Sequence, residues 1–236
     1  MTMSKSLQKP TILNVETVAR SRLFNVESVD LEFSNGVRRV YERMRPSTRE
    51  AVMIVPIVDD HIILIREYAV GTESYELGFS KGLIDPGETV DEAANRELKE
   101  EVGFGANKLT FLKKLSMAPS YFSSKMNILV AEDLYPESLP GDEPEPLPQV
   151  RWPLAQLMSL LDEEDFNEAR NVSALFWCAS GCWLRAGSER KRAVSSNKKA
   201  PAGAFFVRTV RGFHLRRQSG WCPPHGPPAA WAGFLQ

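Results

Sequence analysis

Cysteine and histidine are scarce in this sequence of 236 residues, which contains three of each. All three cysteines lie at position 178 or beyond, so the first 177 residues offer no thiol nucleophile. The spacing of the cysteines does not match that of a zinc site. No obvious Ser-His pair is present either. The main body of the chain thus lacks two common arrangements for nucleophilic catalysis.

Long apolar runs are also missing. None approaches the roughly 20 residues that a membrane-spanning helix requires. Basic residues occur within Met1–Pro10, but no apolar stretch follows them. The sequence thus predicts no secretory signal, no membrane partner and a cytoplasmic location. Hydrophobic residues make up 43% of the chain and charged residues 25%, which is the balance of an ordinary globular protein with a sizeable core.

The net charge of −1 conceals an uneven distribution. Residues 177–236 contain ten of the 29 lysines and arginines, but only one of the 30 acidic residues. The same segment has four of the five tryptophans and shows neither helical nor strand periodicity. A boundary is therefore predicted at residue 177, followed by an atypical basic tail. This tail is either a disordered arm that contacts nucleic acid or a frame-shifted extension without function.

The remaining residues alternate between strand and helix patterns. Residues 1–46 predict an antiparallel β subdomain, with a hairpin turn at Asn35-Gly36. Residues 51–58 are almost continuously apolar, which indicates a strand buried on both faces. The other predicted elements are strands at 61–70, 109–116, 126–131 and 150–153, helices at 154–161 and 165–176, a Gly-rich loop at 78–87 and an acidic, proline-rich loop at 132–148. This long loop is either functional or a solvated linker.

The strongest helical signal follows the Gly-rich loop. Thr89 and Glu92 have the spacing of a capping box, and Gly103 is typical of a helix end. Apolar residues recur every four positions and predict one buried stripe, namely Val90, Ala94, Leu98 and Val102.

Three glutamates project from another side of this helix. Glu97, Glu100 and Glu101 lie at positions i, i+3 and i+4, where like charges repel by roughly 0.2–0.5 kcal/mol per pair. Taken alone, they suggest a solvated charged face. Converging carboxylates are also the oxygen ligands that Mg²⁺ prefers when it bridges a protein to substrate phosphates.

The spacing upstream decides between these interpretations. Gly82 is followed after five residues by Glu88, and after seven more by Arg96-Glu97-Leu98. Glu100-Glu101, Gly103 and the apolar Phe104 complete the pattern G-x5-E-x7-R-E-U-x-E-E-x-G-U, where U is an apolar residue. Every specified position matches the sequence box of the Nudix hydrolases, which this chain resembles from about residue 11 to residue 176.

The resemblance implies an α/β fold, an α/β/α sandwich around a mixed β-sheet that occupies residues 47–176. It implies hydrolysis of a diphosphate linkage by water, with Mg²⁺ or Mn²⁺ as cofactor. Glu97, Glu100 and Glu101 are the expected metal ligands, and Glu100 is alternatively the general base. Glu88 and Arg96 are expected to support and orient them. The candidate metal set also includes Lys81.

The flanking residues resemble the ADP-ribose pyrophosphatase branch of the family, because Pro119 lies 15 residues after the end of the box. This branch implies a homodimer built through the N-terminal strands. It implies ADP-ribose, NADH and diadenosine polyphosphates as small-molecule substrates, with AMP released. Candidate substrate-binding residues are Arg66, Glu76, Pro119 and Tyr121, although Arg66 also suits a surface ion pair and Pro119 a turn. Glu143 and Glu145 are alternative candidates for a catalytic carboxylate in the late loop.

One departure concerns the segment before the box. The stretch from Glu76 to Gly82 is two residues longer than is usual in this branch. Two other functions remain open. The basic tail gives slight support to a Nudix hydrolase that acts on RNA 5′ ends, but nucleic acid is not the expected partner. A Nudix domain that senses nucleotides without catalysis is the third, although such domains usually lose the carboxylates kept here.

Overall fold

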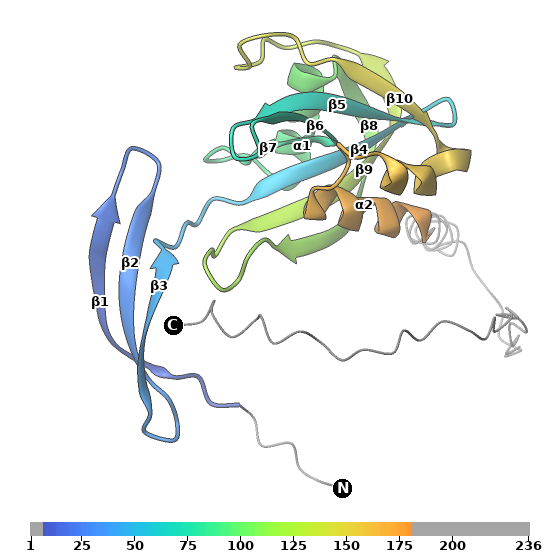
Figure 1. The fold of residues 1–236 in the computed structure, drawn as a ribbon. Helices are drawn as coiled ribbons and strands as arrows, with labels where there is room; N and C mark the ends of the chain where they lie inside the picture. The colour runs from blue at the N-terminus through green and yellow to red at the C-terminus, as the bar shows by residue number, and fades with distance from the viewer. Residues whose placement is uncertain (1–6, 181–236) are drawn as a thin grey trace, which may run out of the picture. The chain divides into compact units, whose positions relative to one another are not determined.

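The computed structural model describes residues 7–180 (Figure 1). Its first part is a three-stranded antiparallel sheet in the order β1 (Thr11–Arg20), β2 (Asn25–Glu32) and β3 (Arg38–Met44). Gly36 adopts a φ of 81° in the turn between β2 and β3, a conformation that glycine reaches without steric cost. The predicted N-terminal hairpin is confirmed. The predicted tail lies outside the described residues from position 181 onward.

A seven-stranded mixed sheet forms the second part. The strands are β4 (Ala51–Val58), β5 (His61–Ala69), β6 (Ser74–Gly78), β7 (Ser80–Leu83), β8 (Phe104–Ser116), β9 (Lys125–Pro136) and β10 (Gln149–Pro153). The main path runs β10-β5-β4-β9-β8, while β6 pairs with β5 and β7 with β4. Strands β4 and β9 are parallel, and the other pairs are antiparallel.

Helices cover both faces of this sheet. On one face, Val52 and Ile54 of β4 share a core with Leu98 of α1 (Val90–Glu101). On the other, Met53 and Val55 pack in a core with residues of η1 (Leu154–Asp162) and α2 (Ala169–Ala179). Burying each such side chain stabilises the fold by about 1.5–3 kcal/mol. Strand β4 is thus buried on both faces, as its continuous apolar pattern predicted. The α/β/α sandwich is confirmed.

Several predicted bounds differ from the structure. The β8–β9 hairpin is longer than predicted, because its pairing continues to Phe104 and Pro136. A Cβ on Gly105 would lie 2.3 Å from the ring of Tyr135, so glycine permits this close pairing. The late loop consequently spans only residues 137–148. Residues 154–162 form a 3-10 helix, and α2 begins at Ala169 because the Glu168 side chain caps its first turn. No helix in the described part of the chain is long and apolar enough to cross a membrane.

Phe79 lies between β6 and β7, where the chain crosses from pairing with one strand to pairing with another. It leaves the edge of β5 there and joins β4, so the Gly-rich loop predicted at 78–87 actually contains a strand. The Phe79 ring is fully buried edge-on to Phe166, with 6.1 Å between ring centroids. Its backbone N–H donates to Oδ1 of Asn171 on α2, at 2.9 Å. The two additional residues before Gly82 therefore belong to a packed crossover rather than to a loop.

This crossover predicts a stability defect for Asn171→Ala. The substitution leaves the buried N–H of Phe79 without its acceptor, which costs about 1–3 kcal/mol. Urea denaturation should show this loss in the free energy of unfolding. Ser173→Ala on the same helix removes only a bond to the helix's own backbone and should stay within about 0.5 kcal/mol of the parent. Equal losses for the two variants would contradict the role assigned to Asn171.

Candidate active site

The helix that carries the predicted carboxylates begins with a complete capping box. Oγ1 of Thr89 accepts the N–H of Glu92 at 3.2 Å, and Oε2 of Glu92 accepts the N–H of Thr89 at 2.8 Å. After the C-cap residue, Gly103 adopts a φ of 78°. Ala94 and Leu98 are fully buried against the sheet. Local sequence therefore fixes where α1 begins and ends. Of the predicted stripe, Val102 is also buried but Val90 is only half-buried.

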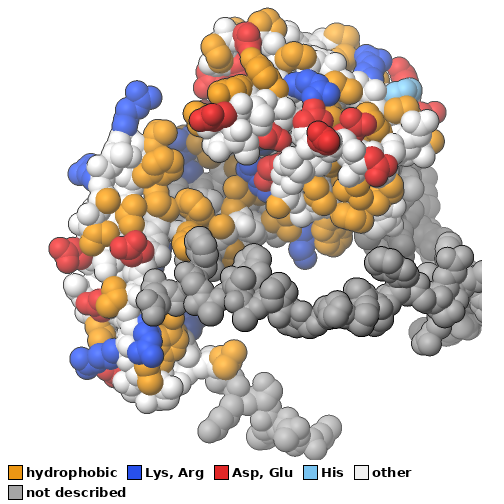
Figure 2. Space-filling view, viewed as in Figure 1, with side chains coloured by type: hydrophobic (Ala, Val, Ile, Leu, Met, Phe, Trp, Pro, Cys, Tyr) orange, Lys and Arg blue, Asp and Glu red, His pale blue; other side chains and the backbone are white. Residues whose placement is uncertain are grey.

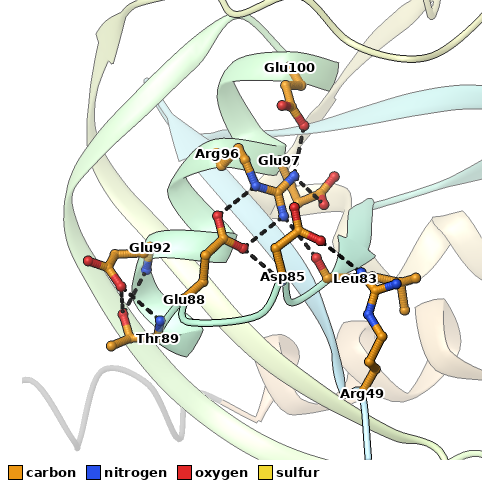
Figure 3. Close-up of polar contacts among 9 residues, drawn as sticks. All are labelled: Arg49, Leu83, Asp85, Glu88, Thr89, Glu92, Arg96, Glu97 and Glu100. Carbon is orange, nitrogen blue, oxygen red and sulfur yellow. Dashed lines mark hydrogen bonds and ion pairs between the residues drawn. The ribbon is translucent and has the colours of Figure 1, made fainter. Parts of the chain in front are cut away.

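Arg96 gathers the acidic side chains on the other side of α1 (Figure 3). Its Nε and Nη2 donate to the two carboxylate oxygens of Glu88, at 2.8 and 3.0 Å. Its Nη1 donates to Glu97 at 2.7 Å and to Glu100 at 2.9 Å. Nη2 also donates to the carbonyl of Leu83 at 2.8 Å. One guanidinium thus offsets the repulsion among three carboxylates and joins the helix to the preceding loop.

Two of the helix glutamates are deeply placed. Glu97 and Glu101 are each 8% exposed. Burial raises the pKa of Glu97, although Arg96 opposes the effect. Burial raises the pKa of Glu101 to about 8, although the N–H of Lys81 donates to it at 2.9 Å. Burial thus disfavours the charged form of both carboxyl groups.

Strand β7 approaches these carboxylates closely. A Cβ on Gly82 would lie 2.0 Å from the carboxyl carbon of Glu97, so a larger residue at this position would displace that carboxylate. The ammonium of Lys81 forms an ion pair with Glu67. An ammonium has no lone pair for a cation, so Lys81 can serve a metal only through its backbone carbonyl.

The carboxylates line an open cleft of about 580 Å³. Its charged lining comprises seven acidic residues, Glu67, Asp85, Glu97, Glu100, Glu101, Asp142 and Glu143, and three basic ones, Arg49, Lys81 and Arg96. All three basic groups are paired with carboxylates, Arg49 with Asp85 at 2.7 Å. The cleft is thus strongly acidic, and a polyanionic substrate needs added positive charge to enter it.

The two loop glutamates have different surroundings. Glu143 lines the cleft beside the α1 carboxylates. Glu145 does not line it, and its Oε1 instead accepts a hydrogen bond from the hydroxyl of Tyr75 at 2.5 Å. Glu143 therefore lines the same cleft as all three predicted metal ligands, whereas Glu145 shares only a neighbouring hollow with Glu100 and Glu101.

The predicted substrate-binding residues lie outside the cleft lining. Arg66 forms an ion pair with Asp165, as its alternative interpretation predicts. Glu76 lies in an adjoining pocket of about 120 Å³ that shares Glu67 and Lys81 with the cleft. Pro119 and Tyr121 lie in the turn after β8. There, the carbonyl of Tyr121 accepts the N–H of Met44 from β3 at 2.9 Å.

Sequence reasoning missed several residues of the cleft. Asp85 lies within the variable part of the box, and Glu67 is next to Arg66 in the same strand, so neighbouring motifs could have suggested both. Arg49 precedes β4 and carried no signal in the sequence. Its place at the cleft depends on tertiary structure, through its ion pair with Asp85.

Comparison with known proteins agrees with this arrangement. Residues 47–176 match the model of the NUDIX domain. The chain belongs to the Nudix hydrolase family. Residues 10–43 match the N-terminal domain of NudE-type Nudix hydrolases. These ranges lie close to the predicted division at residues 46 and 47, although α2 continues to Ala179, past the boundary predicted at 177.

The chain is similar to Nudix hydrolases that are named for ADP compounds or ADP-ribose. The ADP compounds hydrolase NudE of Escherichia coli (strain K12) is 91% identical over 183 residues, covering 78% of this chain and 97% of the relative. The ADP-ribose pyrophosphatase of Bacillus subtilis (strain 168) is 25% identical over 174 residues, covering 72% and 92%. A crystal structure of an ADP compounds hydrolase superimposes with a TM-score of 0.75 at 86% identity, covering 78% of this chain and 98% of that one.

Nudix hydrolases generally use divalent metals, and the donor set of this one fits a hard cation. Among the described residues, no three His, Cys, Asp or Glu side chains form a ready-made metal cage. Mg²⁺ does not need one, because one or two carboxylates usually hold it together with waters and substrate phosphates. Glu97 and Glu101 are buried with raised pKa values, so a cation would supply the charge that they lack.

The raised pKa of Glu101 predicts how stability depends on pH. The folded metal-free protein keeps this carboxyl protonated up to about pH 8, whereas the unfolded chain ionises it near its ordinary pKa of about 4.3. Its contribution to stability is therefore present at low pH and is lost as the pH rises towards 8. Glu101→Gln should then raise the melting temperature in EDTA clearly at pH 8, and much less at pH 5.

Thermal melts at both pH values test this expectation. The exposed Glu163, exchanged for Gln, is the matched control and should show no such dependence on pH. A difference between Glu101→Gln and the parent that is the same at pH 5 and pH 8 would refute the assignment.

Proposed function

We propose that this Nudix hydrolase cleaves the diphosphate linkage of ADP compounds with Mg²⁺ as its cofactor and releases AMP. Mn²⁺ is the alternative ion. The proposed substrates are ADP-ribose, NADH and diadenosine polyphosphates, and the proposed location is the cytoplasm. The observation that carries the proposal is one acidic cleft in which Glu143 lies with all three box glutamates of α1. The similarity to an ADP compounds hydrolase supports the choice of substrate.

Each acidic residue has a proposed task. Glu97, Glu100 and Glu101 would hold the metal, while Arg96 and Glu88 keep these side chains oriented. When bound, the cation supplies positive charge for the phosphate oxygens and lowers the pKa of a coordinated water. Glu143 has no hydrogen-bond or ion-pair partner within the described residues, so its carboxylate is free to take the proton from the attacking water.

The remaining substrate contacts are assigned to the adjoining pocket and to the turn after β8. Oε2 of Glu76 is buried and lacks a hydrogen-bond partner within the described part of the chain, so it suits a sugar hydroxyl. Arg66, held by Asp165, would support this pocket. Tyr121 is 60% exposed in the turn with Pro119, which leaves its ring available to contact a base.

Release of AMP tests the function directly. ADP-ribose, NADH and diadenosine triphosphate are incubated with the full chain and Mg²⁺, and the products are separated by chromatography. We expect AMP from at least one substrate and almost none from Glu101→Gln. Glu143→Gln should lower kcat by about 10²–10⁴-fold, the usual contribution of general-base catalysis.

Other outcomes of this assay would favour the competing functions. Tight binding of ADP-ribose without turnover would indicate a sensor. Hydrolysis of triphosphorylated RNA in place of ADP compounds would indicate action on RNA 5′ ends. Glu143→Gln with the parental kcat would remove Glu143 from the mechanism while leaving the reaction itself established.

We also propose that the chain forms a homodimer through its N-terminal sheet, with a second copy as the partner. Strand pairing places Ile12 and Leu31 beside Val15, Val29 and Tyr41 on one face. Of these, Ile12, Val15 and Tyr41 are 53%, 43% and 51% exposed. Figure 2 shows exposed hydrophobic side chains, interspersed with charged ones, on this part of the molecule. An exposed apolar face of this kind is typical of a protein interface.

A charge placed on this face should separate the two copies. Val15→Lys is expected to shift the sedimentation coefficient from that of a dimer to that of a monomer, because a buried lysine without a partner is costly. Glu16 points to the opposite face of β1, so Glu16→Lys is the matched control and should remain dimeric. A monomeric parent chain, or a dimeric Val15→Lys, would contradict the proposed interface.

A further inference from the structure

The loop that carries Glu143 connects β9 to β10 and is fixed at both ends. Near its start, the N–H of Leu139 donates to the carbonyl of Lys99 on α1 at 3.1 Å. At its end, the carbonyl of Pro148 accepts the N–H of Arg66 on β5 at 2.9 Å. Its two ends are therefore attached to elements that also border the cleft.

The middle of this loop, in contrast to its ends, makes few hydrogen bonds to the rest of the fold. Prolines at positions 140, 144 and 146 have no N–H to donate. Within the described residues, neither Asp142 nor Glu143 has a hydrogen-bond or ion-pair partner. The one hydrogen bond that ties this middle part to the sheet, within residues 7–180, runs from the hydroxyl of Tyr75 to Oε1 of Glu145 at 2.5 Å.

Tyr75 is a well-supported donor. It lies on β6 directly opposite Tyr68 of β5, and the two rings meet edge-on with 5.5 Å between their centroids. Such a pair restricts a side chain that has only two rotatable angles. The hydrogen bond to Glu145 raises the pKa of Tyr75, so its hydroxyl keeps its proton at neutral pH. The loop is thus attached to the paired strands β5 and β6.

Glu143 is separated from Glu145 by a single proline, which limits how far the two can move independently. The Glu143 carboxylate lies over Gly141, where a Cβ would be 2.2 Å from its Oε2. Glu143 lines the cleft, and it also lines a neighbouring hollow together with Glu145, Glu100 and Glu101. A change in the position of Glu145 is therefore passed on to Glu143.

We infer that Tyr75 is a positioning residue, which holds Glu143 at the α1 carboxylates through its hydrogen bond to Glu145. This inference rests on the proposed role of Glu143. It assigns Glu145 to the attachment of the loop and not to the chemistry. A hydrogen bond between partly exposed groups contributes little to stability, so its value lies in where it places the neighbouring carboxylate.

The inference predicts a specific loss in Tyr75→Phe, which keeps the ring pair and removes the donor. kcat should fall about tenfold, because a displacement of about 1 Å costs up to 10²-fold. KM should change less than about twofold, and the melting temperature should stay the same. Tyr41→Phe loses one hydroxyl on β3, which lines neither the cleft nor the adjoining pocket, and it should behave like the parent.

Variants of Glu145 separate attachment from chemistry. Glu145→Gln keeps an oxygen acceptor and should retain most of the parental kcat. Glu145→Ala should lose as much as Tyr75→Phe, and the double variant should lose no more than either, because both remove the same contact. Glu145→Gln with a loss as large as that of Glu143→Gln would overturn the inference, because Glu145 would then be the catalytic carboxylate. Additive losses in the double variant would also overturn it.

Hydrogen exchange of the peptide that spans residues 137–149 gives a measurement independent of activity. Faster exchange there in Tyr75→Phe, with unchanged exchange in α1, supports the attachment of the loop. Unchanged exchange, or faster exchange together with the parental kcat, overturns the inference. An inactive parent chain whose loop still exchanges faster in Tyr75→Phe would refute the proposed function while supporting the attachment.

Discussion

The contact of Arg96 with Glu88, Glu97 and Glu100 is the interaction on which the rest of the site depends. Carboxylates at i and i+3 on a helix repel one another, and burial adds to the cost of keeping them charged. The planar guanidinium meets three of them at 2.7–3.0 Å and also holds the carbonyl of Leu83. It therefore fixes the helix face and the adjacent loop in one arrangement before any metal or substrate is present.

Arg96 does not, however, neutralise the whole site. Glu101 lies beyond its reach, and burial raises the pKa of this carboxyl to about 8. The cleft also contains Glu67, Asp142 and Glu143, while its basic groups are already paired. Ionising the buried Glu101 carboxyl destabilises the fold as the pH rises. A divalent cation would offset the negative charge of the cleft, and the bound cation would then attract a diphosphate.

Two distant segments complete the cleft, and each is fixed by a contact that crosses between elements. The crossover at Phe79 is held by Asn171 of α2, which lets β7 bring Gly82 against Glu97. The loop between β9 and β10 is attached through Tyr75 and Glu145, which leaves Glu143 facing α1. The backbone of the sheet thus positions acidic groups that lie more than 40 positions apart in the sequence.

The sequence by itself determined the features whose causes are local. The capping box at Thr89, the turn at Gly36, the doubly buried β4 and the box from Gly82 to Phe104 all depend on residues that are close together in the chain, so their spacing alone predicts them. Only the tertiary structure placed Glu143 in the cleft and bonded Glu145 to Tyr75, paired Arg66 with Asp165, brought Arg49 to the cleft and turned the predicted loop before Gly82 into a crossover. These outcomes depend on which strands become neighbours and on which partner each side chain meets there, and no local spacing contains that information.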